Sequence, residues 1–134
     1  MTPVYTSAFA QDLLTQIKNA VDGILLGAKL HLFVNDVSPQ KSSVVADFTE
    51  ASFTDYAVHD VTWSADPLTD GSEWKIISDL ASFVAGAAPT PETVYGWYLT
   101  DSAGTGLIAA KRYDDPVQIT QEFDSVQAVV EMAC

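Results

Sequence analysis

Residues 93–100, with the sequence TVYGWYLT, carry the plainest structural signal in the chain. β-Branched and aromatic residues of this kind favour β-strands. The next segment, DSAGTG at 101–106, has the composition of a hairpin loop, so residues 107–113 are expected to return as the following strand. Gly96, in the middle of the first strand, predicts a bulge or a close approach by another backbone.

Short strands and turns are expected on both sides of this hairpin. Over residues 29–34, Leu30, Leu32 and Val34 alternate with Lys29, His31 and Phe33, as one face of a strand would. Turns separate such runs at intervals of about 8–12 residues, which is typical of an antiparallel β-sandwich or small barrel. The fold is therefore expected to be mainly β. Further strands are expected at 56–63, at 74–84 as a pair, at 117–120 and at 126–132, with loops at 35–43, 64–72 and 114–116.

The N-terminal part of the chain has a different period. Apolar side chains recur there every four residues, at Phe9, Leu13, Ile17 and Val21. This spacing, with polar side chains opposite, predicts an amphipathic helix over 9–22. Residues 1–8 are expected to form an extended arm, and residues 28–134 the β-sandwich of a single domain.

The composition limits the classes of partner. A chain of 134 residues can bury a core without disulfides, and its one cysteine, Cys134, excludes an internal disulfide. With 18 acidic and 6 basic residues the net charge is −12, which repels phosphate backbones and anionic lipids, so neither nucleic acid nor a membrane is expected as a partner. A basic protein surface or a divalent cation suits this charge better. Solubility at high copy number explains it equally well.

No catalytic arrangement is visible. Both histidines, His31 and His59, occupy expected strands, where we expect them to face solvent or a subunit interface. The chain is therefore predicted not to be an enzyme and to use no cofactor. Asp66, Asp70 and Glu73 are weak candidates for calcium, but their order does not match an EF-hand loop, so no metal site is predicted.

The aromatic residues allow two interpretations. Tyr95, Trp97, Trp63 and Trp74 could line a carbohydrate-binding face, because flat rings stack on sugars. In a β protein such rings more often fill the core, which is the interpretation we favour.

Two segments together resemble a known family. VADFTEASFTDYA at 45–57 and TVYGWYLTD at 93–101 look like the pattern ADFTEATFxGYA … TIYGYYVTD of small virion structural proteins of tailed bacteriophages, including cyanophages. The resemblance covers roughly residues 30–112. Asp55 stands where the family pattern has glycine, and aspartate tolerates the positive φ that this turn would need.

The residues of the two motifs are expected to have structural roles. Phe48 and Phe53 would fill the core from a loop. Asp47 and Thr49 would tie the loop backbone by local side-chain hydrogen bonds. The remaining motif residues that we assign to the structure are Tyr56, Tyr95, Gly96 and Trp97.

The resemblance implies a capsid cement, or decoration, protein. Such proteins lie on the outer surface of the capsid after assembly in the host cytoplasm, as homo-oligomers that are most often trimers, and clamp neighbouring copies of the major capsid protein. The expected contacts beyond the subunit involve the arm and the helix, at Val4, Tyr5, Phe9, Leu13 and Ile17. Alternatively, both segments pack on their own sheet.

The aromatic residues also suggest a second function. A tail-fibre or surface adhesin would grip a host glycan with its aromatic residues. A cement protein requires an apolar patch on the helix, the arm or one sheet face, whereas an adhesin requires exposed Trp or Tyr in a groove beside polar loops.

Overall fold

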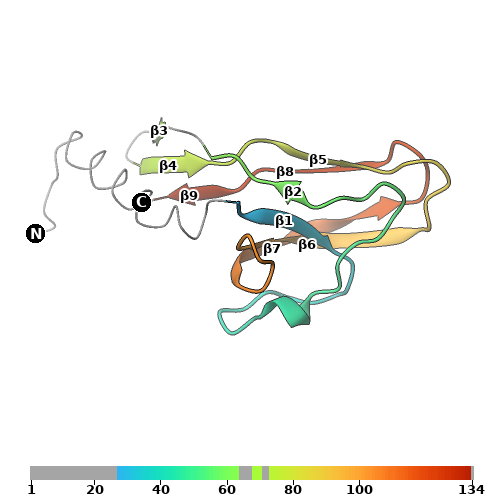
Figure 1. The fold of residues 1–134 in the computed structure, drawn as a ribbon, viewed down its shortest axis with the longest axis horizontal. Coiled ribbons are helices and arrows are strands. Elements are labelled where there is room, and N and C mark those ends of the chain that lie inside the picture. The colour runs from blue at the N-terminus through green and yellow to red at the C-terminus, as the bar shows by residue number, and fades with distance from the viewer. Residues whose placement is uncertain (1–26, 64–67, 71–72, 134) are drawn as a thin grey trace, which may run out of the picture.

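A computed structural model describes residues 27–63, 68–70 and 73–133 (Figure 1). The expected arm at 1–8 and helix at 9–22 lie outside these residues. So do the contact candidates Val4, Tyr5, Phe9, Leu13 and Ile17.

The described part of the chain is mainly β, as expected, and every strand pairing in it is antiparallel. Helical structure there is limited to one 3-10 turn, η1 (Val45–Asp47). The strands are β1 (Lys29–Phe33), β2 (His59–Asp60), β3 (Leu68–Asp70), β4 (Glu73–Ile77), β5 (Ala81–Val84), β6 (Glu92–Thr100), β7 (Leu107–Ile119), β8 (Ser125–Ala128) and β9 (Glu131–Ala133).

The strands form three sheets. The largest is four-stranded, in the order β2-β1-β6-β7, and contains the hairpin predicted from residues 93–113. A three-stranded sheet has the order β3-β4-β9, and β5 pairs with β8. In Figure 1, β5 and β8 run along one side of β1 and β6.

The main core combines side chains from the four-stranded sheet and from the β5–β8 pair. Leu30 and Leu32 of β1 belong to it, as the alternation at 29–34 predicts. Trp97 is only 7% exposed, which confirms the expectation that this ring is buried. Val94, Leu99 and Ile119 are also fully buried in this core, while Phe83, Val126 and Val130 enter from β5, β8 and the residues after β8.

A second, smaller core lies on the opposite face of β1 and β6. Phe33, Phe48 and Tyr98 are buried together there, beneath the loop formed by residues 34–50. β1 is therefore buried on both faces, since His31 and Phe33, on the other face from Leu30 and Leu32, are buried as well. Simple alternation predicts only one buried face, because it cannot show that a distant loop covers the other.

The centre of the β6–β7 hairpin is irregular. Val94 pairs with Val117, but Gly96 pairs with Arg112, so residues 113–116 form the longer side of a register shift. The turn expected at 114–116 is therefore wrong: these residues lie inside β7. Pro116 is compatible with that position because β7 is an edge strand of its sheet.

Several predicted boundaries also need correction. The strand expected at 56–63 reduces to β2, and the loop expected at 64–72 contains β3. The strands expected at 74–84 exist, but β4 pairs with β3 and β9 while β5 pairs with β8. In place of the single strand expected at 126–132, the structure has two strands, β8 and β9. Among the described residues, no helix has the length and apolar character needed to cross a membrane.

Candidate functional site

The loop that carries the first family-like motif is tied by short-range polar contacts. The Asp47 carboxylate accepts a hydrogen bond from the Val44 N–H (2.9 Å), as expected. Thr49 is held differently: its N–H donates to the Asn35 side chain (2.8 Å), and its carbonyl accepts from the Val34 N–H (2.8 Å). The Asn35 amide also donates to the Asp47 carbonyl (2.9 Å), so one side chain closes the loop at both ends.

Phe48 and Phe53 both point inward, but they fill different cores. Phe48 lies 4.9 Å from Tyr98, centroid to centroid, in the smaller core. Phe53 belongs to the main core and meets Tyr56 edge-on at 5.3 Å. The expectation that both rings fill the interior is confirmed. The segment between them therefore connects a residue of the smaller core to a residue of the main core.

The two unusual backbone positions also behave as predicted. Asp55 has φ of 65°, the positive value that its place in the motif requires. A Cβ on Gly96 would lie 2.0 Å from the Lys111 carbonyl oxygen and under 3 Å from the Phe33 ring. Gly96 therefore lies both at a register shift of the β6–β7 pairing and at a close approach to the Lys111 backbone.

A polar network crosses β1 beside this loop. His31 Nδ1 lies 2.6 Å from a Glu50 carboxylate oxygen, and His31 Nε2 lies 2.9 Å from the Thr100 hydroxyl. The Tyr56 hydroxyl donates to Glu50 (2.8 Å) and accepts from the Leu32 N–H (3.1 Å). His31 is buried and stacks on Tyr98 at 4.6 Å, so our expectation that it faces solvent or a subunit interface is wrong.

The hydroxyl, imidazole and carboxylate of Thr100, His31 and Glu50 stand in the order of a catalytic triad. Two features prevent that chemistry in this structure. Thr100 is 0% exposed, so no substrate can reach its oxygen. Its hydroxyl also donates to the Asp101 carbonyl (3.1 Å), and this carbonyl competes with His31 for the hydroxyl proton. We therefore interpret the buried network as structural.

Burial affects the tyrosines of this region. Burial, and secondarily the Glu50 charge, raises the pKa of Tyr98 to about 12. The pKa of Tyr56 is raised further by burial and by Glu50, against the lowering effect of the Leu32 N–H. Both hydroxyls stay protonated at neutral pH, so the Tyr56 hydroxyl can donate its hydrogen bond to the Glu50 carboxylate.

The remaining titratable candidates belong to other parts of the chain. His59 Nε2 pairs with the Asp79 carboxylate (2.8 Å), and the His59 ring lies edge-on to Phe83 at 6.4 Å. Asp70 and Glu73 are paired in the backbone register of β3 and β4, while Asp66 lies outside the described residues. Within residues 27–63, 68–70 and 73–133, no group of three or more His, Cys, Asp or Glu side chains is placed to hold a metal ion.

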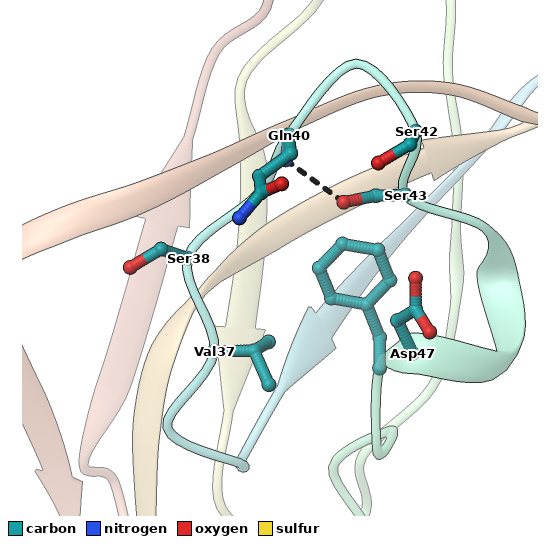
Figure 2. A pocket seen from close by; sticks show the side chains of 7 residues that line it. Val37, Ser38, Gln40, Ser42, Ser43 and Asp47 are labelled. Atoms are coloured by element: carbon teal, nitrogen blue, oxygen red, sulfur yellow. Dashed lines mark hydrogen bonds between the residues drawn. The ribbon is translucent and has the colours of Figure 1, made fainter.

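A pocket of about 400 Å³ opens inside the 34–50 loop (Figure 2). Ser38, Gln40, Ser43 and Asp47 surround it, and the Gln40 N–H donates to the Ser43 hydroxyl (2.8 Å). A second pocket of about 290 Å³ lies between the same loop and the start of β7, at residues 107–110. Neither pocket is lined by Trp or Tyr.

The aromatic candidates are mostly interior residues. Trp97 is in the main core, and Trp63 packs against it partly buried. Tyr95 is half-buried under the Arg112 guanidinium, 5.2 Å from the ring centroid. The Trp74 side chain lies outside what the structure describes.

An unexpected surface lies on the outer side of β5 and β8. Outward positions Ser82 and Gln127 face each other across the ladder, as do Val84 and Ser125. Leu80 (56% exposed) and Val129 extend the two rows beyond Ala81 and Ala128. These six residues, together with Phe123, are called the β5–β8 outer face below. None carries a charge, although the chain has a net charge of −12.

Phe123, the last residue of the β5–β8 outer face, has an energetically unfavourable backbone conformation. Its side chain is 76% exposed, and its φ is 71°. Positive φ costs a non-glycine residue about 1–2 kcal/mol. The Asp124 carboxylate maintains the turn by accepting from the Thr120 and Gln121 N–H groups (2.9 and 3.0 Å), and these bonds lower the pKa of Asp124.

Sequence reasoning missed this face. Its apolar residues are separated by serine and glutamine, so no continuous apolar run marks them. The alternation at 80–84 indicates a strand but does not say which face is covered. Comparisons with protein-family models, with curated proteins and with solved structures find no match for this chain.

Proposed function

We propose that this chain is a non-enzymatic structural protein of a phage virion, a capsid cement protein that oligomerises on the outer shell and clamps neighbouring major capsid proteins. The observation that carries the proposal is the β5–β8 outer face, an uncharged and partly apolar surface on a strongly acidic protein. The specific virion role rests on the sequence resemblance of residues 45–57 and 93–101.

The charge distribution explains why this face matters for assembly. Contact between two protein surfaces requires removal of water, and desolvating unpaired carboxylates is costly. Four of the five large hydrophobic residues that are strongly exposed in the described chain lie on this face: Leu80, Val84, Phe123 and Val129. Apolar area without charge is what a protein contact buries most favourably.

The architecture that we infer for this role is a β-sandwich. The sheet orders in the described residues are open, with β2 and β7 at the edges of the largest sheet. The main core is shared between that sheet and the β5–β8 pair. This arrangement supports a sandwich over a closed barrel, and it leaves the outer side of β5–β8 available to partners.

The test is to locate the protein in virions. Mass analysis of purified particles gives the copy number, and a cryo-electron-microscopy map of the shell gives the position. We expect many copies at the junctions between capsomers. A few copies at the tail tip, or none in the particle, would contradict the cement function.

The adhesin alternative has one observation in its favour, the polar pocket in the 34–50 loop. Hydroxyl, amide and carboxylate groups such as those of Ser38, Gln40 and Asp47 can bind sugar hydroxyls. The absence of Trp and Tyr from the linings of the two described pockets gives it less support. A glycan-array screen with purified protein, compared with a Gln40→Ala variant, decides whether this pocket binds carbohydrate.

A further inference from the structure

We propose that β8 pairs edge to edge with β8 of a second copy of this chain, antiparallel and centred on Gln127, so that two copies share one continuous sheet in the order β5-β8-β8-β5. The inference rests on the proposed function in that it names the edge through which copies of a cement protein join. A two-fold contact of this kind makes a dimer, whereas the resemblance to virion proteins implies a trimer most often.

The main chain of β8 is paired on one side only. Among the described residues β8 belongs to a two-stranded sheet and pairs with β5 alone. The Ala85 N–H donates to the Asp124 carbonyl (2.8 Å), and the Ala85 carbonyl accepts from the Phe123 N–H (3.0 Å), so position 85 bonds toward the chain of β8. Bonding and non-bonding pairs alternate along an antiparallel ladder, and the N–H and C=O groups of Ser125 and Gln127 therefore point away from β5.

The opposite edge of this strand pair is already covered. The Gly86 N–H donates to the Thr54 carbonyl (2.8 Å), and the Asp79 N–H donates to the Thr62 carbonyl (2.7 Å). Residues 54–62 thus follow β5 and are bonded next to both of its ends. Within the described part of the chain, β8 is the open edge of the pair.

The two edge strands β7 and β8 differ in the features that prevent edge pairing. β7 has Lys111, the exposed acids Asp114 and Asp115, Pro116 and a register shift. Charged side chains, proline and bulges are the devices by which proteins block their sheet edges. Residues 125–130, with the sequence SVQAVV, contain no charge and no proline. An edge of this kind is a template for an added strand.

The β8 edge is complementary to itself. In an antiparallel pairing centred on Gln127, this residue faces its own copy, and Ser125 faces Val129 of the second copy. These are the positions whose main-chain groups point away from β5, so they bond to each other across the new ladder. All three also have exposed side chains on the outer side of the sheet, so the pairing keeps the inward side chains of both copies on the core side.

The charges at the two ends of this segment favour the same register. Asp124 precedes the uncharged segment and Glu131 follows it. Centring on Gln127 places each carboxylate opposite an uncharged residue of the other copy, whereas like charges directly opposite one another are destabilising. Two copies with a net charge of −12 each repel one another, so a contact without opposed carboxylates is favoured. Self-complementary two-fold contacts are also the commonest in homo-oligomers.

The pairing widens the surface on which the proposed function rests. A two-fold axis perpendicular to the shared sheet keeps equivalent faces on the same side. The β5–β8 outer faces of the two copies therefore lie next to each other, and the dimer presents twice the uncharged area to the shell.

The first experiment measures the mass of the full-length protein by sedimentation over a range of concentrations. We expect a monomer–dimer equilibrium. Gln127→Lys should raise the dissociation constant by roughly fivefold or more, because it places two like charges opposite each other at the two-fold axis. This change also makes the chain less acidic, so general repulsion between copies does not explain a weaker dimer.

Ser82→Lys is the matched control. Ser82 is the residue of β5 that pairs with Gln127, and both side chains are exposed on the same face. Its lysine is one strand away from the contact and should leave the dissociation constant nearly unchanged. A protein that stays monomeric, a trimer, or equal effects of the two lysines would each overturn the proposal.

Hydrogen exchange distinguishes a second copy from another part of the same chain. The amides of Val126 and Ala128 bond to β5 and should be protected at every concentration, whereas those of Ser125 and Gln127 should become protected only as the dimer forms. Protection of Ser125 and Gln127 that does not depend on concentration would show that the chain covers its own edge. That result, or no protection of these two amides in the dimer, would contradict the inference.

A cross-link tests the register. In a Cys134→Ser background, oxidation of Gln127→Cys should give disulfide-linked dimers, because residue 127 faces its own copy. Ser82→Cys should remain monomeric: its two copies are three strand spacings apart, about 14 Å, beyond the roughly 7 Å that a disulfide can bridge between Cα atoms. Dimers from Ser82→Cys alone would indicate a contact through the outer face and would overturn the edge pairing.

The outcome can be separated from that of the cement function. If virions carry the protein at capsomer junctions but it is monomeric in solution, the function stands and this inference fails. If the dimer forms as expected but virions lack the protein, the inference stands and the function fails.

Discussion

At the scale of single residues, Gly96 is the glycine, among those in the described part of the chain, where a side chain fits least well. A Cβ there would overlap the Lys111 carbonyl and the Phe33 ring, and backbone atoms cannot move aside cheaply. We expect Gly96→Ala to lower the free energy of unfolding by about 1–3 kcal/mol, measured by denaturant titration. Gly104→Ala is the control: nothing lies within 4 Å of its Cβ, so only the cost of its positive φ, about 1 kcal/mol, is expected. Equal losses in the two variants would contradict the packing argument.

Tyr113 offers a prediction of the opposite sign. Its hydroxyl is buried and has no hydrogen-bond partner among the described residues. Because a buried unsatisfied polar group is destabilising, Tyr113→Phe should raise the free energy of unfolding by about 1 kcal/mol.

The matched comparison for Tyr113 is Tyr56→Phe, which removes the bonds to Glu50 and Leu32 and should cost about 1–2 kcal/mol. Chemical denaturation of both variants beside the parent protein provides the measurement. Loss of stability in Tyr113→Phe would show that its hydroxyl has a partner after all.

At the scale of elements, the 34–50 loop is held to β1 through Glu50. Its carboxylate receives the Tyr56 hydroxyl and contacts His31, and residue 50 also bridges to Phe33 along the strand edge. Glu50→Gln keeps the size of the side chain but removes its charge. Because Glu50 is partly exposed, we expect a loss of only about 1–2 kcal/mol, toward the lower part of the range for charged hydrogen bonds.

Hydrogen exchange should show where that loss occurs. The amides of Val34 and Ala51, which bond across the loop and β1, are expected to exchange faster in Glu50→Gln than in the parent protein. The control is Glu122→Gln, which removes an exposed carboxylate from the turn before β8 and should change neither stability nor these amides. Uniformly faster exchange across β6 and β7 would argue against a local role for Glu50.

At the scale of the whole molecule, stability should decrease in alkali. Burial raises the pKa of Tyr98 and Tyr113 to about 12, above the value of about 10 in an unfolded chain. Between these values the folded state retains protons that the unfolded state loses, so unfolding becomes easier as pH rises. The stabilisation is complete below about pH 10 and lost as pH passes about 12.

Denaturant unfolding at a series of pH values, with tyrosinate absorbance recorded in parallel, measures this effect. Tyr113→Phe should reduce the slope between pH 10 and 12 because it removes one of the groups responsible. A slope unchanged by this substitution would mean that Tyr113 ionises freely in the folded protein.

The sequence by itself determined the class of fold and several local features. The strand-forming composition of residues 93–100 and the alternation at 29–34 predicted β6 and β1, because side-chain periodicity is a local property of a strand. Asp55 and Gly96 were predicted correctly for the same reason, since φ preference and the lack of a Cβ belong to the residue itself.

Only the tertiary structure decided which segments meet. The burial of His31, the two separate cores for Phe48 and Phe53, and the inclusion of 114–116 within β7 all depend on pairings between residues far apart in the chain. The uncharged outer face of β5 and β8 has the same origin. A strand exposes alternate residues whatever its surroundings, and only the packing of the sheets determines which of its faces remains at the surface.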